Sequence, residues 1–260
     1  MAQDLFDPVA PEEDLHRSFK LIATTLAHVP TRETMQSVFD SMAEPDGNFV
    51  RDFQTTGFDA RVWELYLWAW GTRSGLYEVY RPHDRPDFRF THELRTAWVE
   101  ACVAGEGPAG VLRPDRDADE AKPFEYQRER QYNFVPLRIG SALFRKLQEE
   151  YWALDWVEGL PLVLAVADFH DPLPARDTSG ALASYLYGVT EEIVSKEGEP
   201  LRRALKPIPD HRKPTGAIVP TGFFKQPEAE NISAVLFSNA GTAPKFSRMG
   251  YDPVRHGFLR

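Results

Sequence analysis

The strongest pattern of apolar and polar positions lies in residues 58–75, FDARVWELYLWAWGTRSG. Apolar side chains recur there at helical spacing, at Val62, Leu65, Tyr66 and Ala69. Asp59 can cap the start of this helix, and Gly71 or Gly75 can end it. The pattern therefore predicts a long helix in the first half of the chain.

Four further segments are typical of helices: residues 15–27, 32–43, 136–154 and 179–195. Thr31 is a candidate N-cap for the second of these, and Pro136 can open the third. The third also places Ile139, Leu143 and Leu147 on one face, at intervals of four residues.

Shorter segments predict strands: residues 76–80, 88–90, 97–103, 161–169 and 232–238. The run PLVLAVADF at 161–169 is apolar throughout, which is typical of a central strand buried on both faces. This order of elements predicts an α/β protein with a central mixed β-sheet flanked by helices.

The remaining segments give weaker patterns. Residues 113–133 are polar and charged and predict no element. Residues 197–230 are rich in proline and charge, so we expect a long connection with one short strand. The tail from residue 241 is expected to be irregular surface chain.

Composition supports a folded globular protein. The chain has 260 residues, 42% hydrophobic content and six tryptophans, and no apolar run approaches the roughly 20 residues of a membrane span. Its N-terminus lacks the features of a signal peptide, so we expect a cytoplasmic protein without a membrane partner. The net charge of −9 argues against a protein that coats nucleic acid, but not against an enzyme with one basic face.

The candidate chemistry lies in carboxylates. Asp87 follows Pro86 and is expected near the start of a strand, and Glu100 stands in the alternating stretch AWVEACV. Trp98, Glu100 and Cys102 share one face of that strand. A buried glutamate is costly unless it is paired or binds a cation, whereas one on an exposed edge strand is simply solvated. The pattern leaves both interpretations open.

Glu64 is a third candidate, within the apolar helix at 58–75. Its spacing alone favours a glutamate at the helix rim that pairs with Arg61. A role as a metal ligand is the alternative.

Together these residues resemble the PD-(D/E)XK nuclease superfamily, which has the restriction-endonuclease-like fold. The resemblance rests on a helix with Glu64, a hairpin with Pro86-Asp87 and a strand with Glu100. The blocks GNFVRDFQTTGFDARVWELYLWA, PDFRF…VEACVA, RIGSALFRKLQEEYW and PLVLAVADFHDP are similar to a bacterial group of that superfamily without an assigned function. The similarity extends over about residues 46–250.

The resemblance implies a restriction-endonuclease-like core at 46–195, preceded by a helical lead-in at 1–45. A proline-rich extension at 196–260 is expected to add a further strand. Mg²⁺, or Mn²⁺, would be bound by Asp87, Glu100 and the carbonyl of Ala101, with Glu64 as ligand to this or a second ion. The implied reaction is hydrolysis of a phosphodiester in nucleic acid, expected to be DNA, by activated water. A homodimer is left open.

The sequence departs from the superfamily at residue 102, where a lysine is expected and Cys102 stands. A neutral thiol cannot stabilise developing negative charge as an ammonium does. One interpretation is that the helix opening at Pro136 supplies the missing charge. Lys146 is its candidate catalytic lysine, and Arg138 and Lys146 are candidate substrate-binding residues. They lie about 80° apart around that helix. The alternative is a nuclease-fold module that binds nucleic acid or protein without cleaving.

Other constellations are weaker. Asp168, His170 and Asp171 gather at the end of the predicted central strand and could bind a metal, although the pattern favours ordinary turn chemistry. Cys102 could be a nucleophile with His170 or His92, but a mid-strand cysteine is typical of an inert buried thiol. Cys102 is also the only cysteine, which excludes an intrachain disulfide and a multi-cysteine zinc site.

Overall fold

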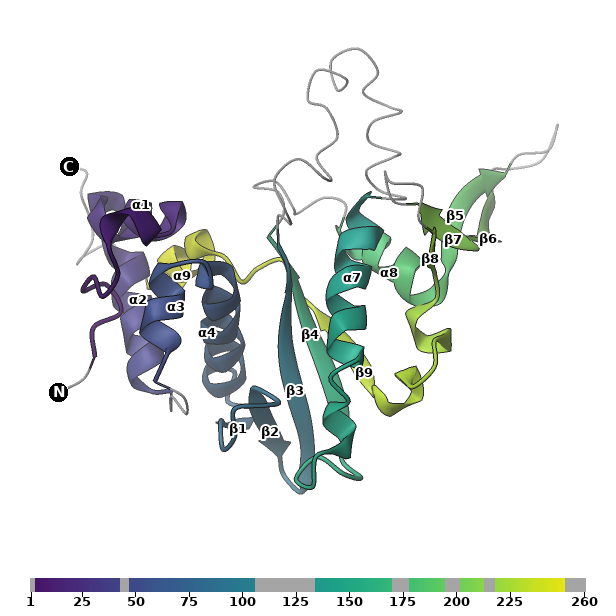
Figure 1. The fold of residues 1–260 in the computed structure, drawn as a ribbon, viewed down its shortest axis with the longest axis horizontal. Coiled ribbons are helices and arrows are strands. Elements are labelled where there is room, and N and C mark those ends of the chain that lie inside the picture. Colours follow the sequence, from purple (N-terminus) through teal and green to yellow (C-terminus); the bar gives the residue numbers. More distant parts are fainter. Residues whose placement is uncertain are drawn as a thin grey trace, which may run out of the picture.

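A computed structural model describes residues 3–42, 47–105, 134–169, 178–194, 202–212 and 218–250. A five-stranded mixed sheet in the order β1-β2-β3-β4-β9 lies between two groups of helices (Figure 1). Its strands are β1 Glu78–Tyr80, β2 Phe88–His92, β3 Arg95–Ala104, β4 Leu162–Asp168 and β9 Ala234–Phe237. The first three strands are antiparallel, and β3, β4 and β9 are parallel. The predicted α/β architecture with a mixed sheet is confirmed.

Strand β4 is central and buried on both faces, as its apolar sequence predicts. Leu162, Leu164 and Val166 pack into one hydrophobic core, and Ala165 and Ala167 pack into another on the opposite face. The sheet therefore separates two cores, and each core is closed by its own group of helices.

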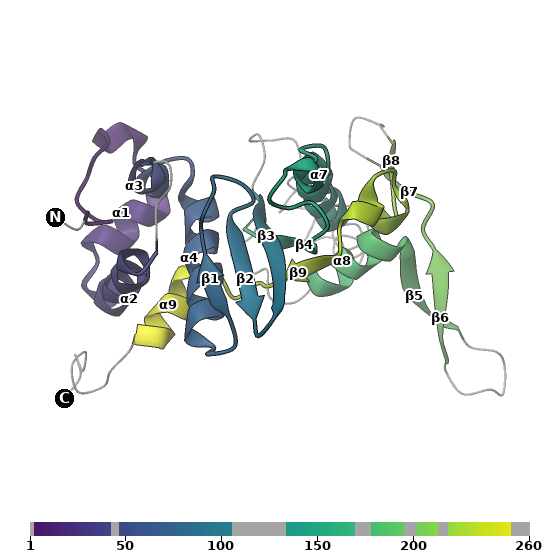
Figure 2. The same cartoon turned by 90° about the horizontal axis from the view of Figure 1, so that it is seen from below.

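The first group of helices is formed mainly by the N-terminal part of the chain. It comprises α1 Arg17–Thr24, α2 Val29–Asp40, α3 Phe49–Gln54, α4 Phe58–Arg73 and α9 Ala243–Gly250, with short 3₁₀ turns at Glu12–Asp14 and Leu26–His28. Helix α4 packs on β3 and β1, and Figure 2 shows it next to β1. Trp63 of α4 is fully buried and its indole N–H donates to the carbonyl of Ala165, 2.9 Å away. This contact fixes α4 to the middle of the sheet.

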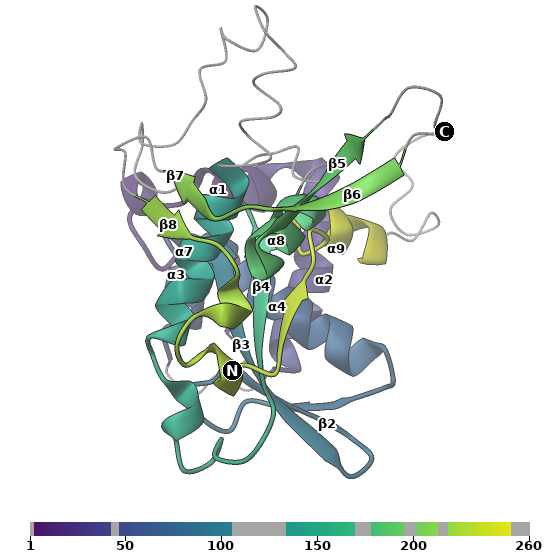
Figure 3. The same cartoon turned by 90° about the vertical axis from the view of Figure 1, so that its right-hand side faces the viewer.

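The second group comprises α7 Val135–Leu147 and α8 Thr178–Tyr187, with 3₁₀ turns at Tyr151–Ala153, Phe223–Lys225 and Ala229–Asn231. Helix α7 packs on both β3 and β4, as its apolar face predicts. Two small hairpins, β5 Val189–Val194 with β6 Arg202–Pro207 and β7 Asp210–Arg212 with β8 Ile218–Pro220, lie on the α8 side of the molecule (Figure 3).

Two predicted helices are shorter than expected. The helix opening near Pro136 ends at Leu147, and Glu150 beyond it has a φ of +50°, which a continuing helix cannot contain. The helix predicted at 179–195 ends at Tyr187, because Gly188 adopts a φ of +67°, and the chain then forms β5. Local periodicity alone does not register these left-handed positions.

The expectation of an irregular tail is wrong for its first part. Residues Ala243–Gly250 form α9, which packs on α2, and Phe246 is fully buried there. Helix α3 is also absent from the sequence-based elements. Both helices have at most eight residues, too few for periodicity to indicate them, and burial of their aromatic side chains stabilises them. The polar stretch at 113–133 lies outside the described residues.

Across the described ranges, none of the helices combines the length and the apolar character that crossing a membrane requires.

Candidate functional site

The site lies where the described strands leave one edge of β3 open. The pairing between β2 and β3 ends at Phe88 opposite Val99, whereas β3 continues to Ala104 with β4 on its other side. Backbone groups of successive strand residues point alternately to the two edges, and the N–H of Trp98 points toward β4 by donating to Pro161. Ala101 and Val103 therefore direct their N–H and C=O groups to the open edge.

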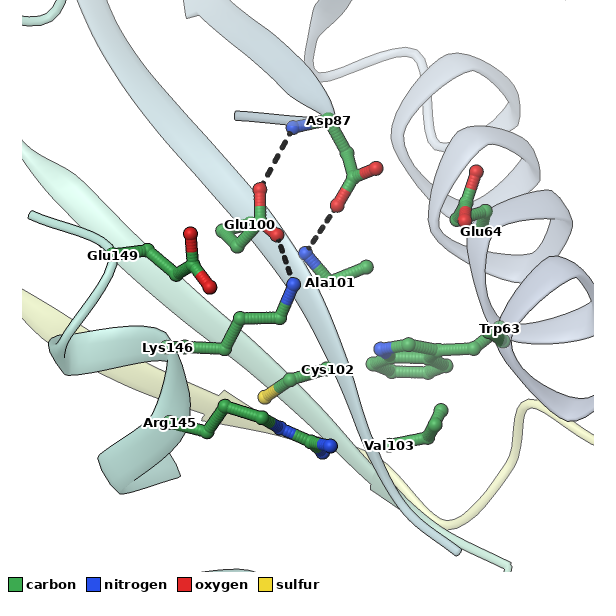
Figure 4. Close-up of a pocket in the computed structure, with 11 residues that line it drawn as sticks. Trp63, Glu64, Asp87, Glu100, Ala101, Cys102, Val103, Arg145, Lys146 and Glu149 are labelled. Carbon is green, nitrogen blue, oxygen red and sulfur yellow. Dashed lines mark hydrogen bonds and ion pairs between the residues drawn. The ribbon is translucent and has the colours of Figure 1, made fainter. Parts of the chain in front are cut away.

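A cavity of about 350 Å³ occupies this edge (Figure 4). Helix α4 from one side of the sheet and helix α7 from the other both reach it, because no strand separates them here within the described part of the chain. The lining residues are Ala60, Trp63, Glu64, Asp87, Glu100, Ala101, Cys102, Val103, Arg145, Lys146 and Glu149.

Asp87 and Glu100 are held together by the backbone. The N–H of Asp87 donates to Oε2 of Glu100 at 3.2 Å, and Oδ2 of Asp87 accepts the N–H of Ala101 at 2.7 Å. Burial, and then the nearby charge of Glu100, raise the pKa of Asp87 to about 7. The two carboxylates therefore repel each other in a buried position, a repulsion that a bound cation would relieve.

Lys146 reaches this carboxylate pair from α7. Its Nζ lies 2.5 Å from Oε1 of Glu100, and the hydroxyl of Tyr151 donates to the same oxygen at 2.9 Å. Burial opposes the charge on Lys146, but the Glu100 carboxylate outweighs burial, so the pKa of Lys146 is raised. Lys146 is therefore an ammonium at neutral pH.

Cys102 lies on β3 two residues after Glu100. Its side chain is buried, and burial raises the pKa of the thiol to about 12. The group is therefore a neutral thiol, which does not fit a thiolate nucleophile. His92, one of its candidate partners, instead bonds the carbonyl of Leu76.

Glu64 lies in the same cavity but is held by two arginines. Arg61 donates to both of its oxygens at 3.1 Å, as the helical spacing favours. Arg81 contacts Oε2 of Glu64 at 3.0 Å and lies 3.9 Å from Oδ1 of Asp87. Burial, and then the charge of Asp87, raise the pKa of Glu64 to about 7 against the effect of both arginines.

Arg81 is the site residue that sequence reasoning missed. It follows β1, in YRPHDRPD, and its side chain is only 4% exposed, between Glu64 and Asp87. An arginine next to a proline-rich turn gives no signal of burial. Only the position of β1 beside β2 brings its guanidinium inward.

Other sequence candidates lie elsewhere. Arg138 is on α7 but does not line the cavity; it is buried, with its guanidinium carbon 5.5 Å from the centre of the Phe134 ring. Asp168 is buried at the end of β4, and His170 and Asp171 lie outside the described residues. The shared basic patch of Arg138 and Lys146 is therefore not formed around this cavity.

The donor set at the carboxylate pair fits a hard divalent cation. Among the described residues, no three His, Cys, Asp or Glu side chains are grouped so that they could hold a metal ion, so the set with Glu64 as a third ligand is not formed here. Asp87 and Glu100 with the carbonyl of Ala101 still offer oxygen donors at the open edge.

The carboxylate pair, its lysine and the open edge thus form one site whose residues come from β3, α7 and the segment before β2. Comparisons of the chain with protein-family models, with curated proteins and with solved structures give no match.

Proposed function

We propose that this protein is a metal-dependent phosphodiester hydrolase that acts on nucleic acid, with DNA as the first substrate to test. The observation that carries the proposal is the contact of Lys146 Nζ with Glu100 at 2.5 Å, because it brings an ammonium to the buried carboxylate pair. The resemblance of the Asp87 and Glu100 motifs to the PD-(D/E)XK superfamily supports the same reaction.

Asp87, Glu100 and the carbonyl of Ala101 would hold Mg²⁺ or Mn²⁺. The ion, when bound, polarises the phosphate and lowers the pKa of an attacking water. Lys146 places its positive charge beside the reacting phosphate and stabilises the negative charge that develops there. Tyr151 holds Glu100 and Lys146 in position from the buried side.

Glu64 acts in this proposal through Arg81. Its two oxygens hold Arg61 and Arg81, and Arg81 in turn faces Asp87. The carboxylate of Glu64 therefore keeps a buried cation in place beside Asp87, and the metal is held by Asp87 and Glu100.

The test incubates the purified protein with supercoiled, linear and single-stranded DNA in Mg²⁺ or Mn²⁺. Asp87→Asn and Glu100→Gln are compared with Glu149→Gln, which removes a partly exposed carboxylate of the same cavity. We expect cleavage by the unmodified protein and by Glu149→Gln, and none by the other two variants. Cleavage by both Asp87→Asn and Glu100→Gln would contradict the assignment of the site.

Calorimetric titration of Mg²⁺ or Mn²⁺ completes the test. Metal binding that requires Asp87 and Glu100, without cleavage of any substrate, would overturn the hydrolase and favour a nuclease-fold module that binds nucleic acid or protein without cutting.

A further inference from the structure

Arg145 lies in the same cavity as the carboxylate pair and has no role in holding it. We infer that Arg145 binds the phosphate next to the one that reacts, so that the substrate is a nucleic-acid strand lying along the open edge of β3. The inference rests on the proposed function, which it extends by naming the length and the path of the substrate.

Two neighbouring cations of the cavity differ in how they are held. Lys146 is engaged by Glu100 and Tyr151. Arg145, the residue before it, makes no ion pair or hydrogen bond with any of the described residues. Its planar guanidinium offers several donors in a geometry that suits a phosphate.

Charge is unevenly distributed along the cavity. Asp87, Glu100 and Lys146 lie together at one end, and the guanidinium of Arg145 points toward Val103 at the other end (Figure 4). Figure 4 shows Cys102 and Val103 beside the side chain of Arg145, and neither of them carries a charge. This end of the cavity is therefore cationic, although the protein as a whole carries a charge of −9.

The open edge of β3 also supports the inference. The backbone of β3 runs between the two ends, and Ala101 and Val103 both direct their backbone groups to the open edge. Backbone N–H groups and arginines are common phosphate contacts in nucleic-acid complexes. A nucleic-acid strand whose reacting phosphate lies at Asp87 would thus place a following phosphate near Arg145.

A purely structural role for Arg145 predicts a different outcome. Arg145 lies in the last turn of α7, where a cation is favoured by the helix dipole without any ligand. In that case its removal affects only stability, or affects every substrate equally.

The experiment compares two substrates in Mg²⁺: a short single-stranded oligonucleotide and bis(p-nitrophenyl) phosphate, a diester with one phosphate and no neighbour. For Arg145→Ala we expect kcat/KM on the oligonucleotide to fall about tenfold and its dependence on log salt to weaken by about 0.7. Hydrolysis of bis(p-nitrophenyl) phosphate should be unchanged. Arg145→Lys should recover part of the loss, and Arg95→Ala, at an exposed position at the start of β3, should match the unmodified protein.

An equal loss on both substrates, or no loss on the oligonucleotide, would overturn the inference while the proposed function stands. If the unmodified protein hydrolyses neither substrate, the proposed function fails. Fluorescence anisotropy of a labelled oligonucleotide then tests whether Arg145 binds a phosphate. Weaker binding by Arg145→Ala than by Arg95→Ala would still support a phosphate site, and equal binding would reject it.

Discussion

The ammonium of Lys146 on α7 lies 2.5 Å from a carboxylate oxygen of Glu100 on β3. Cys102 stands two residues after Glu100 on the same face of the strand and carries no charge. The thiol at position 102 is short and neutral, and the long side chain of Lys146 from the facing helix brings the positive charge to the cavity instead.

Lys146→Met is expected to lower kcat by a factor on the order of 10²–10³, because the ammonium beside the reacting phosphate is lost. Cys102→Lys in the same protein should restore part of this activity, since it returns an ammonium from the strand. Cleavage rates of the single and double variants on one DNA substrate give the measurement. An unchanged rate for Lys146→Met would contradict the assignment.

Tyr151→Phe should lower kcat less than Lys146→Met does. The hydroxyl donates to Glu100 at 2.9 Å in a buried position, so its removal should cost about 1–3 kcal/mol of unfolding free energy. We expect a lower kcat with little change in KM, because the ring remains and only the bond that orients Glu100 is lost. Tyr187→Phe, at an exposed ring, is the matched control for urea unfolding. Equal stability of the two variants would rule out this role.

Arg81→Met should destabilise the protein by about 3 kcal/mol, because it leaves Glu64 and Asp87 buried without that cation. Combining it with Glu64→Gln removes one of the two carboxylates that lose Arg81 as a neighbour. The double variant should therefore lose less stability than the sum of the two single losses. Additive losses in chemical unfolding would show that Arg81 and Glu64 do not act as a pair.

The raised pKa of Asp87 predicts the pH dependence of stability without metal. Its ordinary value is 3.8 and its folded value is about 7, so the folded state binds more protons between these values. The carboxyl therefore favours folding at low pH, and its contribution declines as pH rises from about 4 to about 7. Each pKa unit corresponds to about 1.4 kcal/mol.

The measurement is the free energy of unfolding in EDTA at several pH values, for the unmodified protein relative to Asp87→Asn. We expect the unmodified protein to lose unfolding free energy relative to Asp87→Asn as pH rises. Mg²⁺ should reduce this loss by binding the ionised pair. Asp84→Asn, at an exposed aspartate, is the control. A difference independent of pH would contradict the prediction.

Much of the sheet could be predicted because its strands carry distinct patterns. The apolar run of β4 indicated a central strand, and the alternation in AWVEACV placed Glu100 and Cys102 on one face. The two hairpins after α8 and the helix α9 escaped prediction, because Gly188 and the burial of Phe246 act through long-range packing that local periodicity does not contain.

The site was predictable only in part. Asp87 and Glu100 were found through a motif, and Lys146 through the requirement for a positive charge near them, and the structure brings these side chains into one cavity. Their roles stay predictions. Arg81 could not be found, because its burial depends on how β1 pairs with β2.

Arg145 and Lys146 are consecutive residues on α7, so one helix carries both cations of the cavity. A small translation of α7 relative to β3 would move both cations together, changing the grip on the carboxylate pair and the distance to the far end of the cavity at the same time. Helix α7 also packs on α8, where Gly140 meets the ring of Tyr185, and a larger residue at position 140 would push that ring and the helix carrying both cations apart.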